Sequence, residues 1–231
     1  MKYAILSDIH GNQYALREVL IELEELGIND LLLLGDYVGY YYGIKYVLEQ
    51  INRYNYVAIR GNHEDLLLKG VKDSNFLKTL NLTYGTSHSR CITSLSREKI
   101  NFLTQLPKTH QLDIDNIRIL LCHGTPWCSD EYIYPNSPEA ILARFDEYKY
   151  DFIFFGHTHH QTMLEREDKI IINPGSVGQS REKGGMAFWG IFDTKELRFE
   201  AKCTAYDVQE LEKEVTKYDP GIEYNLKILR R

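Results

Sequence analysis

The sequence has few cysteines, and their spacing does not suggest a disulfide framework. No two of them form a C-x-x-C pair, and the four lie at Cys91, Cys122, Cys128 and Cys203. Such usage is typical of proteins in a reducing compartment. A free thiol at the end of a buried strand, where we place Cys122, behaves as a small apolar side chain. We therefore expect a cytoplasmic protein.

Long apolar runs and an excess of positive charge are also missing. No apolar stretch reaches membrane-spanning length, and no basic segment followed by a long apolar one precedes the first strand. The formal net charge of −6 argues against a broad nucleic-acid-binding face. No linker, internal repeat or low-complexity segment divides the chain. These absences favour a single domain over residues 1–231 that does not act on membranes or nucleic acid.

Five short polar motifs are present, and each ends an apolar, strand-like run. In chain order they are Asp8-Ile9-His10, Gly35-Asp36, Gly61-Asn62-His63-Glu64, Cys122-His123-Gly124 and Gly156-His157-Thr158-His159. Continuous apolar runs are typical of buried parallel strands. In open α/β sheets, functional groups gather beyond the carboxyl ends of the strands. Because five of the eight histidines lie in these motifs, the pattern predicts a metal site at one rim of the fold.

The order and spacing of the motifs resemble the signature of the calcineurin-like metallophosphoesterase superfamily, which reads D-x-H, G-D, G-N-H-[D/E], H and G-H-x-H. Residues 173–178 are similar to a segment found downstream in small bacterial and archaeal members. The resemblance covers about three quarters of the chain and is closest to the small prokaryotic phosphodiesterase-like branch. It implies an α/β fold, a four-layer α/β/β/α sandwich of two mixed β-sheets flanked by helices.

The resemblance also implies ligands for two divalent metal ions. They are Asp8, His10 and His159 for one ion, Asn62, His123 and His157 for the other, and Asp36 for both. A bridging carboxylate is expected because two adjacent cations repel each other strongly. Mixed nitrogen and oxygen donors favour transition metals over Mg or Ca, with Mn expected and Fe, Zn, Ni or Co as alternatives. A water that bridges the two ions would supply a hydroxide nucleophile at neutral pH.

His63 is the expected catalytic residue. It follows Asn62 directly but has no ligand role in the family pattern, so its imidazole is free to donate a proton to the leaving alkoxide or to stabilise the phosphoryl group. Two interpretations are open for Glu64, an orienting role at the site and an acid favoured by the helix dipole. His88 and His110 lie outside the motifs and are interpreted as surface or loop histidines rather than ligands, and His160 as either exposed or supporting the ligands.

Arg181 and Tyr40 are the candidate substrate-binding residues. A guanidinium fits the geometry of phosphate, and Arg60 offers a second one unless it forms a surface ion pair. The rings of Tyr37, Tyr40, Tyr41 and Tyr42 could stack on a nucleobase, with ordinary packing at the rim as the alternative.

One departure from the family pattern concerns the protein serine/threonine phosphatases and the symmetrical diadenosine tetraphosphatases. In those enzymes G-D continues as x-V-D-R-G, with an Asp that partners the catalytic His and an Arg that holds phosphate. Here Gly39 and Tyr40 occupy these two positions. The departure argues against a protein phosphatase.

We therefore predict a dinuclear metal-dependent phosphoesterase whose partner is a small phosphorylated substrate of phosphodiester or nucleotide type, diadenosine polyphosphates included. One alternative is a phosphomonoesterase or protein serine/threonine phosphatase. Another is a non-catalytic metal-binding scaffold, which is disfavoured because every ligand and His63 are kept. The sequence leaves the oligomeric state open, and it places specificity in loops and in a helical insert around residues 66–107.

Overall fold

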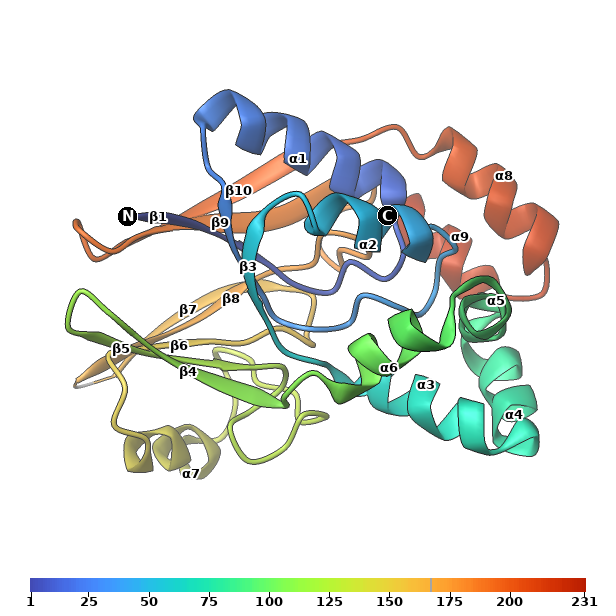
Figure 1. Cartoon of the computed structure of the whole chain (residues 1–231). Helices are drawn as coiled ribbons and strands as arrows, with labels where there is room; N and C mark the ends of the chain where they lie inside the picture. Colours follow the sequence, from blue (N-terminus) through green and yellow to red (C-terminus); the bar gives the residue numbers. More distant parts are fainter. Residues whose placement is uncertain (167) are drawn as a thin grey trace.

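The computed structural model describes residues 1–166 and 168–231 and contains two β-sheets between layers of helices (Figure 1). Sheet A has the strand order β10-β9-β1-β2-β3, and sheet B has the order β4-β5-β6-β8-β7. The strands of sheet A are β1 (Lys2–Leu6), β2 (Asp30–Leu33), β3 (Asn55–Ala58), β9 (Met186–Asp193) and β10 (Arg198–Ala205). Those of sheet B are β4 (Thr109–Ile114), β5 (Ile117–Cys122), β6 (Phe152–Phe154), β7 (Gln161–Arg166) and β8 (Lys169–Pro174).

The helices fall into an outer group that covers the sheets and a group at one end of the molecule. The outer helices are α1 (Gln13–Leu26), α2 (Ile44–Ile51) and α7 (Glu139–Leu142), which continues into a 3-10 turn at Ala143–Glu147. Those at the end are α3 (Asn62–Lys72), α4 (Ser74–Tyr84), α5 (Ser87–Ser94), α6 (Arg97–Gln105), α8 (Gln209–Tyr218) and α9 (Glu223–Leu229). Among the described residues, no helix has both the length and the apolar character needed to cross a bilayer.

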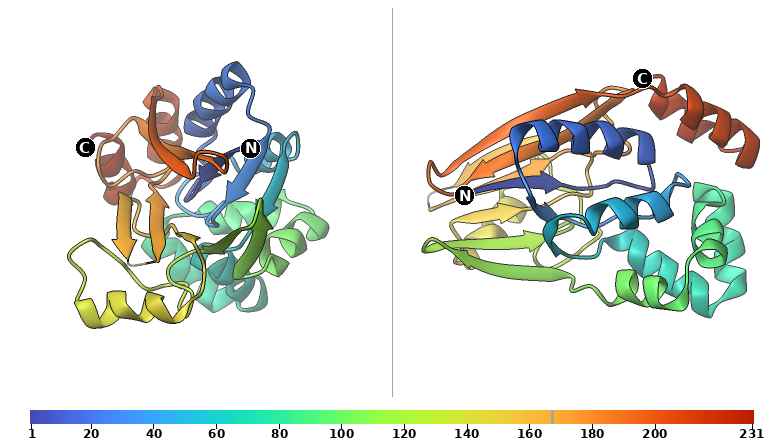
Figure 2. Two further views of the ribbon diagram at one scale, coloured as in Figure 1. Left: turned by 90° about the vertical axis from the view of Figure 1, so that its left-hand side faces the viewer. Right: turned by 45° about the horizontal axis from the view of Figure 1, so that its top comes forward.

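Three hydrophobic interfaces separate the layers. Successive side chains of a strand point to opposite faces of its sheet, so β1 sends Leu6 toward α1 and Ile5 toward sheet B. Ile5 packs in a cluster with Phe154 of sheet B, and on the outer face of that sheet Ile153 packs in a cluster with Phe145. Figure 2 (left) shows the blue α1 outside one sheet and the yellow α7 outside the other. The predicted four-layer α/β/β/α sandwich is confirmed.

Helix α1 has the boundaries that its sequence predicts. The Asn12 side chain accepts a hydrogen bond from the backbone N–H of Ala15 at 3.1 Å, which satisfies one of the free donors of the first turn. Gly27 ends the helix in the left-handed conformation, with φ of 66°. The side chains buried between these ends belong to one face, which packs against sheet A; they are Ala15, Leu16, Val19, Leu20 and Leu23.

Each sheet contains three parallel strands, and five of these six strands carry the polar motifs at their carboxyl ends, while β8 ends in the segment 173–178. In sheet A, β1, β2 and β3 are parallel, and in sheet B, β5, β6 and β8 are parallel. β1 runs from the N-terminus toward the end of the molecule where α3–α6, α8 and α9 gather (Figures 1 and 2). The predicted helical segment around residues 66–107 corresponds to α3–α6; its role in specificity stays a prediction. Two strands that the sequence analysis did not identify, β4 and β7, are the edges of sheet B.

Candidate metal centre

The structure brings the seven predicted ligands together where the strands of both sheets end. Three groups of side chains have ligand atoms within 4.8 Å of one another, and all their members are buried: Asp8, His10 and His159; His10, Asp36 and His63; and Asp36, His123 and His157. Asn62 joins the third group, because its side-chain oxygen lies 3.0 Å from His123 Nε2 and 3.1 Å from His157 Nδ1. The ligand role of each residue stays a prediction; their convergence is observed.

Asp36 occupies the middle of this cluster. Its Oδ2 atom lies 3.7 Å from His10 Nε2 and 3.2 Å from His123 Nε2, and these two histidines were predicted to bind different ions. Asp8 Oδ1 is similarly 3.8 Å from both nitrogens and 3.3 Å from His159 Nε2. A carboxylate placed between the two sets of histidines has the position that a bridging ligand needs.

Backbone carbonyls fix the orientation of three of the histidines. His10 donates its Nδ1–H to Val38 O at 2.8 Å, and His123 donates to Leu34 O at 2.7 Å. His159 likewise donates its Nδ1–H to Gln179 O at 2.6 Å. A carbonyl can only accept a hydrogen bond, so Nδ1 carries the proton in each case. The lone pairs of the three Nε2 atoms therefore face the cluster, as second-sphere hydrogen bonds arrange them in metalloproteins.

These lone pairs meet one another without a proton between them. His10 Nε2 and His159 Nε2 are only 3.1 Å apart, and in neutral rings with the proton on Nδ1 neither Nε2 carries a hydrogen. His123 Nε2 faces the Asn62 side-chain oxygen at 3.0 Å and Asp36 Oδ2 at 3.2 Å, so three potential ligand atoms meet there as well. Closely spaced acceptors in a buried site are unfavourable unless a cation lies between them. The donor set of imidazole nitrogens, carboxylates and an amide oxygen therefore fits divalent transition-metal ions.

The charges of the centre are coupled across the same cluster. Burial alone would raise the pKa of Asp8, but the neighbouring histidines, His159 foremost, hold it well below its usual value. Burial raises the pKa of Asp36, and the Asp8 carboxylate adds to this shift. Burial disfavours charge on His123, yet Asp36 and Asp8 raise its pKa to about 10. The two carboxylates thus keep His123 protonated and positively charged. A divalent ion that displaces this proton would supply the positive charge in its place.

The motif loops adopt strained backbone conformations. Asp8, His10, Asp36, His157 and His159 all have φ between 51° and 66°, in the left-handed region that residues other than glycine seldom occupy. Such strain persists only where the surrounding structure enforces it, and it concentrates at functional sites. Here each left-handed residue turns the chain sharply after a strand, so that neighbouring side chains of one motif reach the same centre.

Glu64 supports two of these loops from behind. Its carboxylate accepts hydrogen bonds from the backbone N–H groups of Asp36, Tyr37 and Gly61 at 2.8 to 2.9 Å, and from Val38 at 3.2 Å. Burial, helped by the Asp36 charge, raises its pKa to about 7. Of the two interpretations left open by the sequence, Glu64 therefore has an orienting role, and it also caps α3 through Gly61. Its position three residues after the N-cap was the available signal.

The downstream segment 173–178 holds the first and last motifs together. Asn173 Nδ2 donates to Gly156 O at 2.6 Å and to Thr158 Oγ1 at 2.9 Å. Ser176 Oγ donates to the backbone oxygen of Asp8 at 2.8 Å. A Cβ atom on Gly178 would lie 1.8 Å from the Ile9 carbonyl oxygen, so only glycine fits this approach. The segment fixes the relative position of strand ends from sheets A and B.

His63 lies at the edge of the centre in an aromatic cage. Its backbone N–H donates to Asp36 Oδ1 at 2.8 Å, and its ring packs against four others at centroid distances of 4.8 to 5.3 Å, those of His10, Tyr40, Tyr84 and His88. Its buried Nδ1 has no hydrogen-bond partner among the described residues, and a Cβ on Gly39 would lie 2.2 Å from this atom. Gly39 therefore leaves space for the ring where protein phosphatases have an Asp.

The interpretation of His88 as a surface or loop residue is wrong. It is fully buried on α5 and stacks on His63, with the ring planes 18° apart. Burial lowers its pKa to about 4, so the imidazole is neutral. The signal for this position was helical periodicity, because His88 lies one turn before buried Cys91 on the same face of α5.

Of the remaining candidate residues, some lie at the metal centre and others only stabilise the fold. Tyr40 packs on His10 with a centroid distance of 4.7 Å and is 6% exposed, whereas Tyr37 and Tyr41 are buried in the core and cannot stack on a base. Arg60 is structural, since it pairs with Asp65 at 2.8 Å. Arg181 is half-buried at the rim, and its Nε atom has no partner among the described residues.

Tyr132, which follows the His123 motif in the chain, also lines this rim. Its ring lies 4.2 Å from that of His157, and the Arg181 guanidinium lies 5.5 Å from its centroid. The tyrosine-rich composition of the chain hid this position, because nothing in the sequence separates a rim tyrosine from a packed one.

Comparison with known proteins identifies one family and two relatives that match most of the chain. Residues 1–196 match the family model described as the calcineurin-like phosphoesterase superfamily domain. The Methanocaldococcus jannaschii protein MJ0912 is 29% identical over 232 residues, which cover 93% of this chain and 91% of the relative. Phosphodiesterase MJ0936 of the same organism is 22% identical over 201 residues, or 86% of this chain and 96% of that protein.

Solved structures show the same architecture. A metallophosphoesterase from Sphaerobacter thermophilus aligns with a TM-score of 0.80 at 24% identity, over 99% of this chain and 98% of that one. At this identity the likeness concerns the fold.

Proposed function

The chain belongs to the calcineurin-like phosphoesterase superfamily and is a metal-dependent phosphoric ester hydrolase, and we propose that it hydrolyses phosphodiester or nucleotide-type substrates. We also propose that two divalent transition-metal ions bind at its centre, and we expect Mn²⁺ to occupy both positions in vitro. The observation that carries the two-ion proposal is the position of Asp36 Oδ2 between His10 Nε2 and His123 Nε2. A relative named as a phosphodiesterase supports the substrate class. The four free cysteines are consistent with a cytoplasmic location, which we also propose.

Each residue of the centre would contribute a different part of the hydrolysis. When bound, the ions supply Lewis acidity and lower the pKa of water to about 7. Burial and the neighbouring histidines lower the pKa of His63 well below its usual value, so its ring is neutral. Its buried Nδ1 faces Gly39, which leaves Nε2 as the nitrogen that can donate a hydrogen bond to the leaving oxygen as negative charge develops there. Arg181 supplies a guanidinium for the phosphoryl oxygens. Glu64 and segment 173–178 keep the motif loops in place, so that these groups need no rearrangement during the reaction.

The first expected result is a content of two metal ions per chain. Protein loaded with Mn²⁺ and passed through a desalting column should contain two ions per chain by elemental analysis. Its electron paramagnetic resonance spectrum should show exchange coupling, because a carboxylate such as Asp36 that binds both ions would couple them. A single ion per chain at saturating Mn²⁺, without coupling, would show that the centre is mononuclear.

The second expected result is a preference for diesters over phosphoproteins. A phosphomonoester carries nearly two negative charges at neutral pH, so it depends more than a diester on the Arg that this chain replaces with Tyr40. We expect kcat/KM for bis-p-nitrophenyl phosphate to exceed that for a phosphoserine peptide by about tenfold or more, corresponding to about 1.4 kcal/mol of transition-state binding. A peptide preferred by the same factor would instead favour the protein phosphatase alternative.

A further inference from the structure

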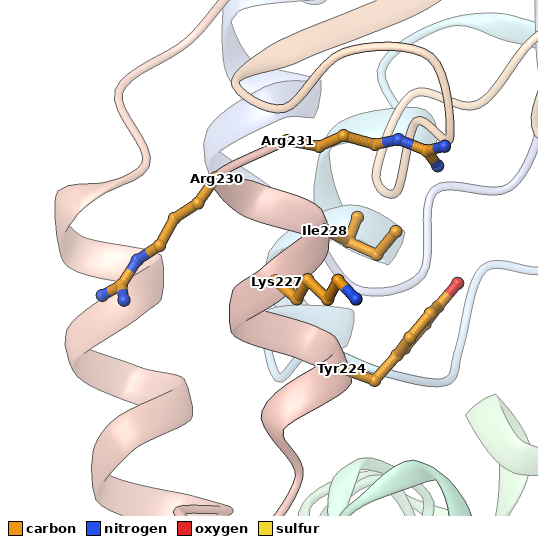
Figure 3. Close-up of a pocket in the computed structure, with 5 residues that line it drawn as sticks. All are labelled: Tyr224, Lys227, Ile228, Arg230 and Arg231. Atoms are coloured by element: carbon orange, nitrogen blue, oxygen red, sulfur yellow. The ribbon is translucent and has the colours of Figure 1, made fainter.

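Beside the metal centre, helix α9 lines a cavity with cationic side chains, and we propose that this distal pocket binds a second phosphoryl group of the substrate. The pocket is defined by Tyr224, Lys227, Ile228 and Arg231, with Arg230 at its border (Figure 3). The inference rests on the proposed function and makes it more specific. The substrate class becomes a nucleotide with a polyphosphate chain, rather than any phosphodiester.

The cavity has the dimensions of a ligand site. Its volume is about 580 Å³, within the range of roughly 300 to 1,000 Å³ that is common for small-molecule pockets. Its lining combines one aromatic ring, one aliphatic side chain and cationic groups, and none of the described acidic side chains lines it. In a chain with a net charge of −6, such a local positive surface attracts an anion.

Helical spacing places the pocket residues on one face. Tyr224, Lys227, Ile228 and Arg231 are related as i, i+3, i+4 and i+7, so their side chains share one side of α9. Figure 3 shows them directed to that side, while Arg230 points the other way. Arg230 is bound to Glu212 of α8 at 2.7 Å. In contrast, neither Lys227 nor Arg231 has an ion-pair partner among the described residues, so their charges are available to a ligand.

A row of aromatic rings connects the distal pocket to the metal centre. Tyr224 lies 6.2 Å from Tyr40 between ring centroids, and Tyr40 lies 4.7 Å from His10. Tyr224 is 43% exposed, so its ring is accessible from the pocket. Arg181 is half-buried at the rim of the centre, 5.5 Å from the centroid of the Tyr132 ring, and its Nε atom has no partner among the described residues. The contact between Tyr224 and Tyr40 thus places the distal pocket next to the rings that surround the metal centre.

The pocket is held in place before any ligand arrives. Asp219, which follows α8, accepts hydrogen bonds from the Thr86 N–H at 2.9 Å and from the Tyr42 hydroxyl at 2.6 Å. The Gly184 N–H donates to the Arg231 carbonyl at 3.2 Å. These bonds tie α8 and α9 to the helices around His63 and to the loop after Arg181. A preorganised cationic site loses less entropy when a phosphate binds.

Direct binding to metal-depleted protein tests this inference without relying on catalysis. ATP and inorganic triphosphate are titrated calorimetrically into wild-type protein and into the double variant Lys227→Ala/Arg231→Ala. Charge-assisted hydrogen bonds from two cations are lost, so the affinity for both probes should fall by about tenfold or more. The charge-retaining variant Lys227→Arg/Arg231→Lys should restore binding to within a few fold of wild type.

The double variant Lys195→Ala/Arg198→Ala is the matched control. It removes two exposed cations at the β9–β10 turn, at the other end of the molecule (Figure 1), and should bind both probes like wild type. In the metal-loaded control variant, kcat/KM for bis-p-nitrophenyl phosphate should stay within twofold of wild type, since both of its substitutions lie at the other end of the molecule. Wild-type affinity of the α9 variant, weakening for ATP alone, or equal weakening in the control would overturn the proposal. Absence of esterase activity would overturn the proposed function instead, and the binding comparison would still decide this inference.

Discussion

Replacing Asp36 with Asn will remove the metal ions and with them almost all hydrolysis. The Asp36 carboxylate faces both sets of histidines and approaches His123 more closely than Asp8 does, and an amide provides only one oxygen donor and no charge between two cations. We expect fewer than one tightly bound ion per chain. Loss of several kcal/mol of Lewis-acid stabilisation lowers kcat/KM by about 10³-fold or more. Elemental analysis together with steady-state kinetics on bis-p-nitrophenyl phosphate measures both effects.

The melting temperature of the same variant should no longer fall when a chelator is added. Ligand binding at 100 times Kd stabilises a protein by about 2.7 kcal/mol, which for a chain of this size corresponds to a Tm shift of about 5–10 °C. Wild type should therefore lose this amount when EDTA removes the metal, whereas Asp36→Asn should change little.

Asp130→Asn is the control for both measurements. Its carboxylate also lies near a histidine of the centre, 3.7 Å from His157 Nε2, but it is 71% exposed. Solvent screens such a charge, so the metal content and the chelator response of this variant should match those of wild type. An Asp36→Asn variant that keeps two ions per chain would contradict the bridging role.

The convergence of the residues of the centre could be predicted from the sequence because each of them closely follows a buried strand in the chain. Each motif follows an apolar run directly, so a strand of sheet A or B delivers residues such as Asp8 and His157 to a fixed place. Buried on both faces, these strands have sequences that contain little besides apolar side chains. The α/β/β/α layering and the convergence of the seven side chains could therefore be inferred before the structure was known.

Edges and ends of the fold were harder to predict because their sequences carry mixed signals. Strands β4 and β7 form the two edges of sheet B, where only one face is buried. β4 alternates exposed and partly buried residues and contains Thr109, His110 and Asp113, so it reads as a polar loop after Pro107. β7 is similar, with Gln161 and Arg166 at its ends. For such segments, pairing with a neighbouring strand decides the structure, and pairing is not a local property.

The surroundings of the centre depend on long-range packing that no motif encodes. His88 reaches His63 because α5 folds back over α3, and Tyr224 approaches Tyr40 from a helix near the other end of the chain. The separations are 25 residues for the first pair and 184 for the second. A sequence pattern describes neighbours along the chain, so it predicted which side chains converge at the centre but did not find Tyr84, His88 and Tyr224, which pack around His63 and Tyr40.

His63→Ala will separate catalysis from metal binding. A positioned general acid contributes roughly 10²–10⁴-fold to turnover, so kcat should fall within this range while two ions per chain remain bound. The contact of His63 with the Asp36 carboxylate runs through its backbone N–H, which the substitution keeps. His160→Ala is the matched control, since it removes a partly exposed imidazole directly after the last motif, and it should change kcat by less than about twofold.

The competing interpretation makes His63 a metal ligand, because it shares a group of close ligand atoms with His10 and Asp36. In that case His63→Ala would lose metal as Asp36→Asn does, and its chelator response would disappear. The leaving group provides a second, independent distinction. A substrate with p-nitrophenolate as leaving group needs little protonation, whereas an alkyl ester needs much, so loss of a general acid should slow the alkyl ester far more. Equal losses on both esters, together with missing metal, would assign His63 to the metal centre and leave Arg181 as the remaining cationic group at the scissile phosphate.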